Sequence, residues 1–272
     1  AYKDSEVYQF GRDYLIPKPV DPRVLFLIAP AVAKAAMDSG VARRMVNIEE
    51  YTTQIGRILG PTQNMMRRLR REISEKRHSI KRQPVIVIPH AYDRRILRAA
   101  AQVADEGDVR IVLLGSTKRI VENADKNGLP KLETKVELID PFYSDLLEPF
   151  AEQFFKMRER KGATRTGAVQ LMYNHNYFAS MMVKTGRADG LVSGVVENYP
   201  TSAKPVLEII GVESKKMPVG IYMVMIGQKQ YFFADTTINV TPDSEALAEI
   251  ALSTAELAKR YTTEKIRVAM LS

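Results

Sequence analysis

The middle of the chain alternates between short apolar runs and stretches with apolar residues at helical spacing. The run at 85–88 is continuous and β-branched, which is typical of a parallel strand that is buried on both faces. The full pattern predicts strands at residues 85–88, 111–114, 136–139 and 188–192. It predicts helices at residues 93–104, 118–127, 142–160, 164–173 and 177–185. Strands that alternate with helices predict an α/β fold, in which a parallel sheet has helices on both faces.

The two ends of the chain carry other patterns. A helical stretch is predicted to begin at Pro22, because proline suits the first position of a helix. A second stretch, rich in alanine, is predicted from Pro30 to about Ser39, with Gly40 as its C-cap. After the sheet, the pattern predicts helices at 201–210 and 243–261, and strands at 219–225, 230–234 and 268–271, with a turn at Gly227 and Gln228.

These patterns divide the chain into four segments. The helical unit at residues 1–55 is too short to own a hydrophobic core, so we expect it to dock on something outside this chain. A connector follows at residues 56–82, then the first part of the sheet domain at 83–197 and the start of a second subdomain at 198–272. Because the chain has no initiator Met and ends on an apolar run, we expect it to be part of a longer protein.

The composition excludes several classes of protein. The chain has no cysteine, which excludes disulfides and thiolate metal sites. Its three histidines, His78, His90 and His175, are far apart in the sequence, which argues against a zinc site or a histidine-based triad. No run of about 18 apolar residues predicts a membrane span, and the first residues do not form a signal peptide. We therefore expect a cytoplasmic protein.

Positive charge is concentrated in the connector. The formal net charge of the chain is +8, and residues 57–82 hold nine Lys or Arg against two Glu. This stretch predicts a basic amphipathic helix. One alternative is a nucleic-acid-binding module, but no aromatic residue lies among the charges to stack on bases. A solvated linker helix is the favoured interpretation.

A binding site has to be sought at the ends of the strands. The sequence holds neither a GxGxxG nor a Walker motif, so the common nucleotide fingerprints are missing. Ligands of open parallel sheets bind beyond the carboxyl ends of the strands, near helix N-termini. Four such ends carry small or polar residues: Pro89–His90, Gly115–Thr117, Asp140–Pro141 and Ser193–Val195. Glycine and serine are also ordinary turn residues, which is the alternative at each end.

Two further groups of polar residues are candidates for anion binding. The loop after the fourth strand offers Tyr199, Thr201 and Lys204, next to Ser193 and Gly194 at the strand end. Arg158 and Lys161 end a predicted helix, where they can bind phosphate or simply complement the helix dipole. Asp235 is either a charged site group or the first residue of an Asx-turn. His175 is interpreted as a helix-junction residue rather than a catalyst.

The region from Pro84 to Ser272 resembles phosphotransacetylase (phosphate acetyltransferase). The block Gly186–Gly194 is the most specific match. The other matching stretches are Val87–Pro89, Asp93–Ala100, Arg158–Gly162, Phe178–Val183, Lys204–Pro205, Ala246–Ala251 and Met270–Ser272. Two departures stand out: these acetyltransferases usually carry Glu-Gly in place of His90-Ala91, and Arg in place of Lys204. At an anion site, a lysine lacks the planar fork with which arginine binds. We interpret both departures as favouring ligand sensing over catalysis.

The N-terminal unit resembles a different family. The stretches Gly11–Pro19, Asp21–Arg23 and Ala29–Ala42 are similar to the carboxyl end of a bacterial malic enzyme domain. A malic enzyme tail followed by a phosphotransacetylase-like region is the order found in multidomain bacterial NADP-dependent malic enzymes. The resemblance covers nearly the whole chain except the connector, and it identifies residues 1–55 as the tail and residues 83–272 as the phosphotransacetylase-like region.

The resemblance implies a function. These enzymes decarboxylate malate oxidatively to pyruvate and CO2 with NADP and Mg2+ or Mn2+, whose sites would lie outside this chain, so the chain alone is expected to be non-catalytic. The phosphotransacetylase-like region would bind acetyl-CoA as an allosteric effector, and the resemblance suggests inhibition. The expected effector site comprises Lys204, Tyr199, Thr201, Ser193, Gly194, Arg158 and Lys161. A homo-oligomer with a dimer contact through this region is expected, with no membrane and no nucleic-acid partner. The main alternative is an active phosphate acetyltransferase.

Overall fold

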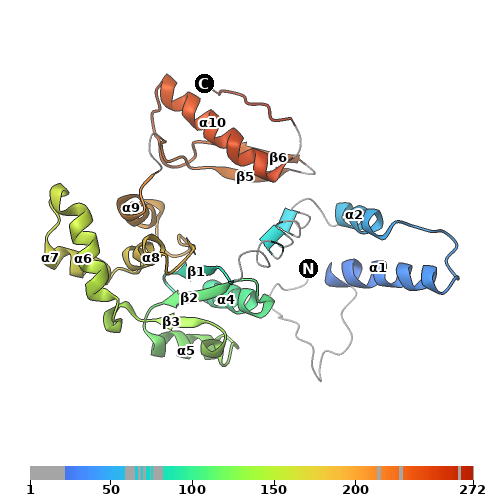
Figure 1. Cartoon of the computed structure of the whole chain (residues 1–272), viewed down its shortest axis with the longest axis horizontal. Coiled ribbons are helices and arrows are strands. Elements are labelled where there is room, and N and C mark those ends of the chain that lie inside the picture. Colours follow the sequence, from blue (N-terminus) through green and yellow to red (C-terminus); the bar gives the residue numbers. More distant parts are fainter. Residues whose placement is uncertain are drawn as a thin grey trace. The chain divides into compact units, whose positions relative to one another are not determined.

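A computed structural model describes residues 22–58, 65–66, 69, 72–73, 75, 82–212, 216–226, 229–262 and 265–271 (Figure 1). The chain divides into two units. One comprises Ala1–Arg70, Tyr222–Phe233 and Leu257–Arg267, and the other comprises Arg71–Ile221, Ala234–Glu256 and Val268–Ser272. Most of the basic connector at residues 56–82 lies outside the described residues. Within the part of the chain that the structure describes, no helix is both long and apolar enough to cross a bilayer.

The second unit contains a four-stranded parallel sheet. Its strands are β1 (Val85–Ile88), β2 (Arg110–Leu114), β3 (Glu137–Ile139) and β4 (Gly190–Leu191), in the order β3-β2-β1-β4. The register pairs Val85 with Arg110, Ile86 with Gly190 and Val112 with Glu137. The structure confirms the predicted α/β fold class.

Helices cover both faces of this sheet. The side chains of a strand alternate between the two faces, and here both sets are apolar, so each face is packed against helices. On one face, Ile111 and Leu113 of β2 pack with α4 (Arg94–Glu106) and α5 (Thr117–Lys126). On the other face, Val112 and Leu114 pack with α6 (Leu147–Arg158), α7 (Arg165–Met172) and α8 (His175–Lys184). These four side chains of β2 are all buried, which explains the continuous apolar run in the sequence.

Two contacts tie the start of the sheet together. The Asp189 carboxylate, just before β4, accepts hydrogen bonds from the Arg82 guanidinium at 2.8 and 2.5 Å. It also accepts a bond of 2.8 Å from the backbone N–H of Val85 at the start of β1. The Arg82 guanidinium and the Val85 N–H together lower the pKa of Asp189, so the carboxylate stays charged. The connector therefore ends on a charged anchor at β1 and β4.

The predicted helix at 142–160 is wrong at residues 142–146. A 3₁₀ turn, Pro141–Tyr143, comes first, and α6 begins only at Leu147. Asp140 caps the turn through the N–H of Phe142, and the Ser144 hydroxyl accepts from the N–H of Leu146. These side chains compete with helical hydrogen bonding, and the backbone of Ser144 is extended. A second 3₁₀ turn, Glu159–Lys161, follows α6.

The first unit contains α1 (Pro22–Asp38) and α2 (Ile48–Ile58). The prediction of two helical stretches was wrong, because α1 runs continuously through Pro30. The proline ring has a helical φ, although it removes one backbone donor and crowds the carbonyl four residues earlier, and α1 accommodates both effects. Gly40 lies just past the helix end with φ +74°, as the C-cap prediction requires. α1 and α2 line a shallow apolar groove with residues that include Val24, Ile28 and Tyr51.

The remaining elements are α9 (Tyr199–Ile209), β5 (Tyr222–Ile226), β6 (Lys229–Phe233) and α10 (Ser244–Tyr261). β5 and β6 are antiparallel, with Tyr222 opposite Phe233, and the predicted turn at 227–228 lies outside the described residues. The predicted strand at 268–271 is wrong: the described residues 265–271 pair with no strand, and Leu271 is 83% exposed. An apolar run forms a strand only where another strand accepts its hydrogen bonds. Asp235 is an Asx-turn residue, because its carboxylate accepts from the N–H groups of Thr237 and Ile238.

Candidate functional site

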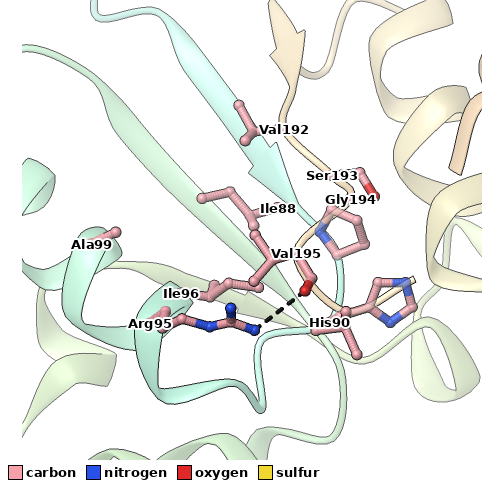
Figure 2. Close-up of a pocket in the computed structure, with 11 residues that line it drawn as sticks. Ile88, His90, Arg95, Ile96, Ala99, Val192, Ser193, Gly194 and Val195 are labelled. Carbon is pink, nitrogen blue, oxygen red and sulfur yellow. Dashed lines mark hydrogen bonds between the residues drawn. The ribbon is translucent and has the colours of Figure 1, made fainter. Parts of the chain in front are cut away.

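The strand order places a crevice between β1 and β4. From β1 the chain runs to β2 and β3 on one side of the sheet and then returns to β4 on the other, so the order reverses between β1 and β4. Ligands of open α/β sheets bind at such a switch point, beyond the carboxyl ends of the strands. A crevice of about 330 Å³ lies there, and its walls come from the residues after β1, the residues after β4 and α4 (Figure 2).

The walls of this crevice are mainly apolar. Figure 2 shows Ile88 of β1, Ile96 and Ala99 of α4, and Val192 and Val195 of the loop after β4 around the hollow. The polar lining residues are His90, Arg95 and Ser193, and the remaining ones are Pro89, Gly194 and Val196. A hollow of this kind suits an uncharged ligand portion with few hydrogen-bonding groups.

The Arg95 guanidinium is already engaged at the rim. It forms two hydrogen bonds of 2.9 Å with Asp93, the N-cap residue of α4, and donates to the Val195 carbonyl at 3.2 Å (Figure 2). The side-chain bond from Arg95, followed by the backbone bond, lowers the pKa of Asp93 to about 2, so the pair stays ionised at neutral pH. Arg95 thus ties the start of α4 to the loop after β4.

A polar cluster lies beside the crevice, around Asn176 of α8. The Asn176 side chain is fully buried; its Oδ1 accepts from the Ser193 hydroxyl at 2.7 Å, and its Nδ2 donates to Glu197 at 2.6 Å. His90 Nε2 lies 3.2 Å from Asn176 Nδ2 and 3.3 Å from Glu197 Oε1. A single buried amide therefore connects the end of β1, α8 and the loop after β4.

Ring contacts extend this cluster toward β2. The His175 ring lies 5.4 Å from that of His90 and 6.4 Å from that of Tyr92. Burial, and then the charge of His90, lower the pKa of His175, which keeps its imidazole neutral. The Tyr92 hydroxyl accepts from the N–H of Ser116 at 2.6 Å. His175 is the first residue of α8 and follows the end of α7, which agrees with its interpretation as a helix-junction residue.

The structure brings some of the predicted site residues together. Ser193 and Gly194 line the crevice, and α9 begins a few residues later at Tyr199, after its N-cap Asn198. Thr201 bonds to that cap through its hydroxyl and its backbone N–H. Lys204 lies exposed on α9, and no carboxylate among the described residues pairs with it. These five predicted residues therefore lie along one loop and the helix that it enters.

The other two predicted residues lie on a different element. Arg158, at the end of α6, forms an ion pair of 3.4 Å with Glu208 of α9. Glu208 also accepts from the Tyr177 hydroxyl at 2.6 Å. Arg158 thus has a structural partner that ties α6 to α9, whereas Lys161 lies exposed in the 3₁₀ turn that follows α6.

Sequence reasoning missed Asn176, Glu197 and Arg95. Each belongs to a residue type that is common on surfaces, and its role depends on partners that are distant in sequence, such as Val195 for Arg95. One signal was present: Asn176 precedes a buried apolar stretch in α8, where a polar side chain needs a partner. Among the described residues, no three His, Asp or Glu side chains lie close enough together to hold a metal ion.

Comparisons with known proteins agree with this geometry. Residues 68–272 match the phosphate acetyl/butaryl transferase family. The NADP-dependent malic enzyme of Escherichia coli K12 is 32% identical over 276 residues, covering 100% of this chain and 35% of that enzyme. A phosphate acetyltransferase of Staphylococcus epidermidis is 38% identical over 188 residues, covering 69% of this chain and 56% of that enzyme.

A solved structure has the same fold. The EutD phosphotransacetylase from Staphylococcus aureus superimposes with a TM-score of 0.60 at 34% identity, covering 66% of this chain and 54% of that one. The chain therefore spans about half the length of these transferases and about a third of the malic enzyme. Both similarities that were inferred from the sequence, to malic enzymes and to phosphotransacetylases, are confirmed.

Proposed function

This chain belongs to the phosphate acetyl/butaryl transferase family, and we propose that it is the phosphotransacetylase-like part of an NADP-dependent malic enzyme. The proposal rests on similarity to such an enzyme along the whole chain. The complete protein would oxidise and decarboxylate malate to pyruvate and CO2, with NADP and a divalent metal bound outside these residues. In this proposal it is a symmetric homo-oligomer.

Within that enzyme, we propose that the region described here binds acetyl-CoA as an allosteric effector. The observation that carries this is the apolar crevice at the switch point, followed along the chain by an exposed Lys204 with no described carboxylate as partner. Acetyl-CoA combines an uncharged thioester arm with several phosphate charges. The arm suits the apolar walls, and the phosphates suit a free cation.

The state of Ser193 supports binding rather than catalysis. A serine becomes a nucleophile when a neighbouring base takes its proton. Here the Ser193 hydroxyl donates to the amide oxygen of Asn176, which is not a base, and its other hydrogen-bond partner is the Ser202 hydroxyl at 3.4 Å. Ser193 is therefore suited to accept a hydrogen bond from a ligand.

One observation favours a second function, an active phosphate acetyltransferase. The transferase of Staphylococcus epidermidis is 38% identical over 188 residues, which is higher than the identity to the malic enzyme. An assay of acetyl-CoA formation from acetyl phosphate and CoA separates the two functions. We expect no turnover by this protein, and turnover above the uncatalysed rate would favour the transferase.

The substitution Lys204→Ala tests the effector site. In the full-length protein we expect the midpoint of the acetyl-CoA response to rise about tenfold or more, because a charge-assisted hydrogen bond contributes about 1.5–3 kcal/mol. The malate rate without acetyl-CoA should stay nearly unchanged. Lys184→Ala is the matched control, since Lys184 is an exposed lysine at the end of α8.

The measurement is malate-dependent NADPH formation at increasing acetyl-CoA concentration. A midpoint that stays within about twofold in Lys204→Ala, roughly 0.4 kcal/mol, would show that this loop is not the effector site. A full-length protein that forms no NADPH from malate would contradict the malic enzyme proposal itself.

A further inference from the structure

We infer that Asn176 is the positioning residue that holds the loop from Ser193 to Glu197 against the crevice, so that the acetyl-CoA response depends on it. This inference rests on the proposed function and adds a regulatory element to the same site. Asn176 is absent from the crevice walls. Any effect that it has on a bound ligand must therefore pass through the residues that it contacts, which are the loop and His90.

The contacts of the Asn176 amide fix its orientation. Its Nδ2 lies 2.6 Å from a carboxylate oxygen of Glu197, so this atom must be the donor. Its Oδ1 lies 2.7 Å from the Ser193 hydroxyl and accepts from it. The flipped amide would set its oxygen against the Glu197 carboxylate. The same side chain therefore holds both ends of a five-residue loop.

Alternate residues of this loop are anchored from different sides. Ser193 and Glu197 bond to Asn176, and the Val195 carbonyl between them accepts from Arg95 of α4. Gly194 has φ +102° and no atom near its missing Cβ, and Val196 is 55% exposed. The loop is thus held by hydrogen bonds at residues 193, 195 and 197, whereas residues 194 and 196 are exposed.

The loop leads directly into α9. Asn198, the residue after Glu197, is the N-cap of this helix, and Lys204 lies in its second turn. Releasing Glu197 would therefore free the entry of α9 as well as the crevice wall. The buried polar groups left without partners would add to the cost of the released state.

A swap of the two partners tests the inference. Asn176→Asp sets two carboxylates against each other, and we expect it to raise the acetyl-CoA midpoint of the full-length protein about tenfold. Glu197→Gln can rotate its amide to accept from Asn176, so about a threefold rise is expected. In the double variant, the amide introduced by Glu197→Gln can donate to the carboxylate introduced by Asn176→Asp. The midpoint should then return to within about threefold of the original.

Hydrogen exchange gives a second readout. The backbone N–H groups of Thr201 and Ser202, which bond to the cap residue Asn198 directly after the loop, should exchange faster in Asn176→Asp and recover in the double variant. Ser180→Ala is the control: Ser180 is fully buried in α8, and its hydroxyl bonds to the backbone carbonyl of Asn176 without touching the loop. We expect this variant to lose stability while the acetyl-CoA midpoint stays within about twofold.

The outcomes separate this inference from the proposed function. A folded Asn176→Asp variant with an unchanged midpoint and unchanged exchange at Thr201 and Ser202 would overturn the inference, as would a double variant that shows no recovery. If the original protein does not respond to acetyl-CoA, the proposed function fails, and hydrogen exchange alone still decides whether Asn176 holds the loop. If Asn176→Asp does not fold, Glu197→Ala removes the same contact from the loop side, and unchanged exchange there overturns the inference.

Discussion

His175 and Asn176 are neighbours in sequence with different surroundings. Asn176 is fully buried and bonds to the loop after β4, whereas His175 contacts the rings of His90 and Tyr92. Burial disfavours the charged imidazolium, and the nearby His90 adds repulsion, so the pKa of His175 lies below its ordinary value of 6.5. The folded protein consequently takes up a proton at His175 less readily than the unfolded chain does.

This difference sets a pH dependence of stability. Well above pH 6.5, His175 is neutral in both states and its contribution is complete. As the pH falls through 6.5, the unfolded chain binds the proton first, so the free energy of unfolding decreases. We expect His175→Gln to remove this decrease, which is at most about 1.4 kcal/mol per pH unit. Chemical denaturation at pH 7.5 and 5.5 measures it. Equal pH slopes for the original and the variant would contradict the prediction.

At the residue scale, the sequence predicted which residues lie at the site better than it predicted the residues that they bond to. Ser193 and Gly194 were candidates because small residues at a strand end commonly bind ligands, and both line the crevice. Arg158 was a candidate for phosphate binding, but the structure pairs it with Glu208. That pairing joins residues that are 50 positions apart, and no local pattern encodes it.

At the scale of elements, the predicted bounds agree with the structure where a capping residue in the sequence marks the end of a helix. α4 begins after Asp93, which caps the N–H of Arg95, and ends before Gly107 with φ +72°, so its bounds could be predicted from two residues. β4 is shorter than predicted and comprises only Gly190 and Leu191, although the flanking N–H groups of Asp189 and Val192 also donate to carbonyls of β1. The strand predicted at 268–271 failed because pairing depends on a neighbour that the pattern does not specify.

The placement of α4 beside the crevice gives a test at this scale. Ala99 lines the crevice and is exposed, so Ala99→Phe should fill part of the hollow without overpacking the core. We expect the acetyl-CoA midpoint to rise about fivefold or more, with a loss in helix propensity of only about 0.5 kcal/mol. Gln102→Phe is the control, because Gln102 is an exposed residue of the same helix outside the crevice walls.

Titration of the full-length protein with acetyl-CoA, together with thermal unfolding, distinguishes the two α4 variants. Similar melting temperatures with a shifted midpoint only in Ala99→Phe would support the crevice as the binding site. A shift of equal size in both variants would indicate a general effect on α4 and would argue against the crevice.

For the whole molecule, the two similarities lie along the chain in the order that the sequence predicted. The similarity to malic enzymes extends over the entire chain, while the match to the transferase family starts at residue 68. The unit that contains α1 and α2 leaves large apolar side chains exposed, among them Leu27 and Val32. That residues 1–55 are too short to form a core by themselves stays a prediction.

The last prediction concerns malate turnover. Oxidative decarboxylation of malate in the proposed enzyme needs bound NADP and a divalent metal. The sequence of this chain has no GxGxxG or Walker motif, and the described residues hold no group of three metal-binding side chains. We therefore expect residues 1–272 alone to form no NADPH from malate with Mg2+ or Mn2+, while the full-length protein does. The measurement is NADPH absorbance at equal molar concentrations of the two proteins. Malate-dependent NADPH formation by residues 1–272 would place catalytic groups within this chain and would contradict an effector-binding role for the region.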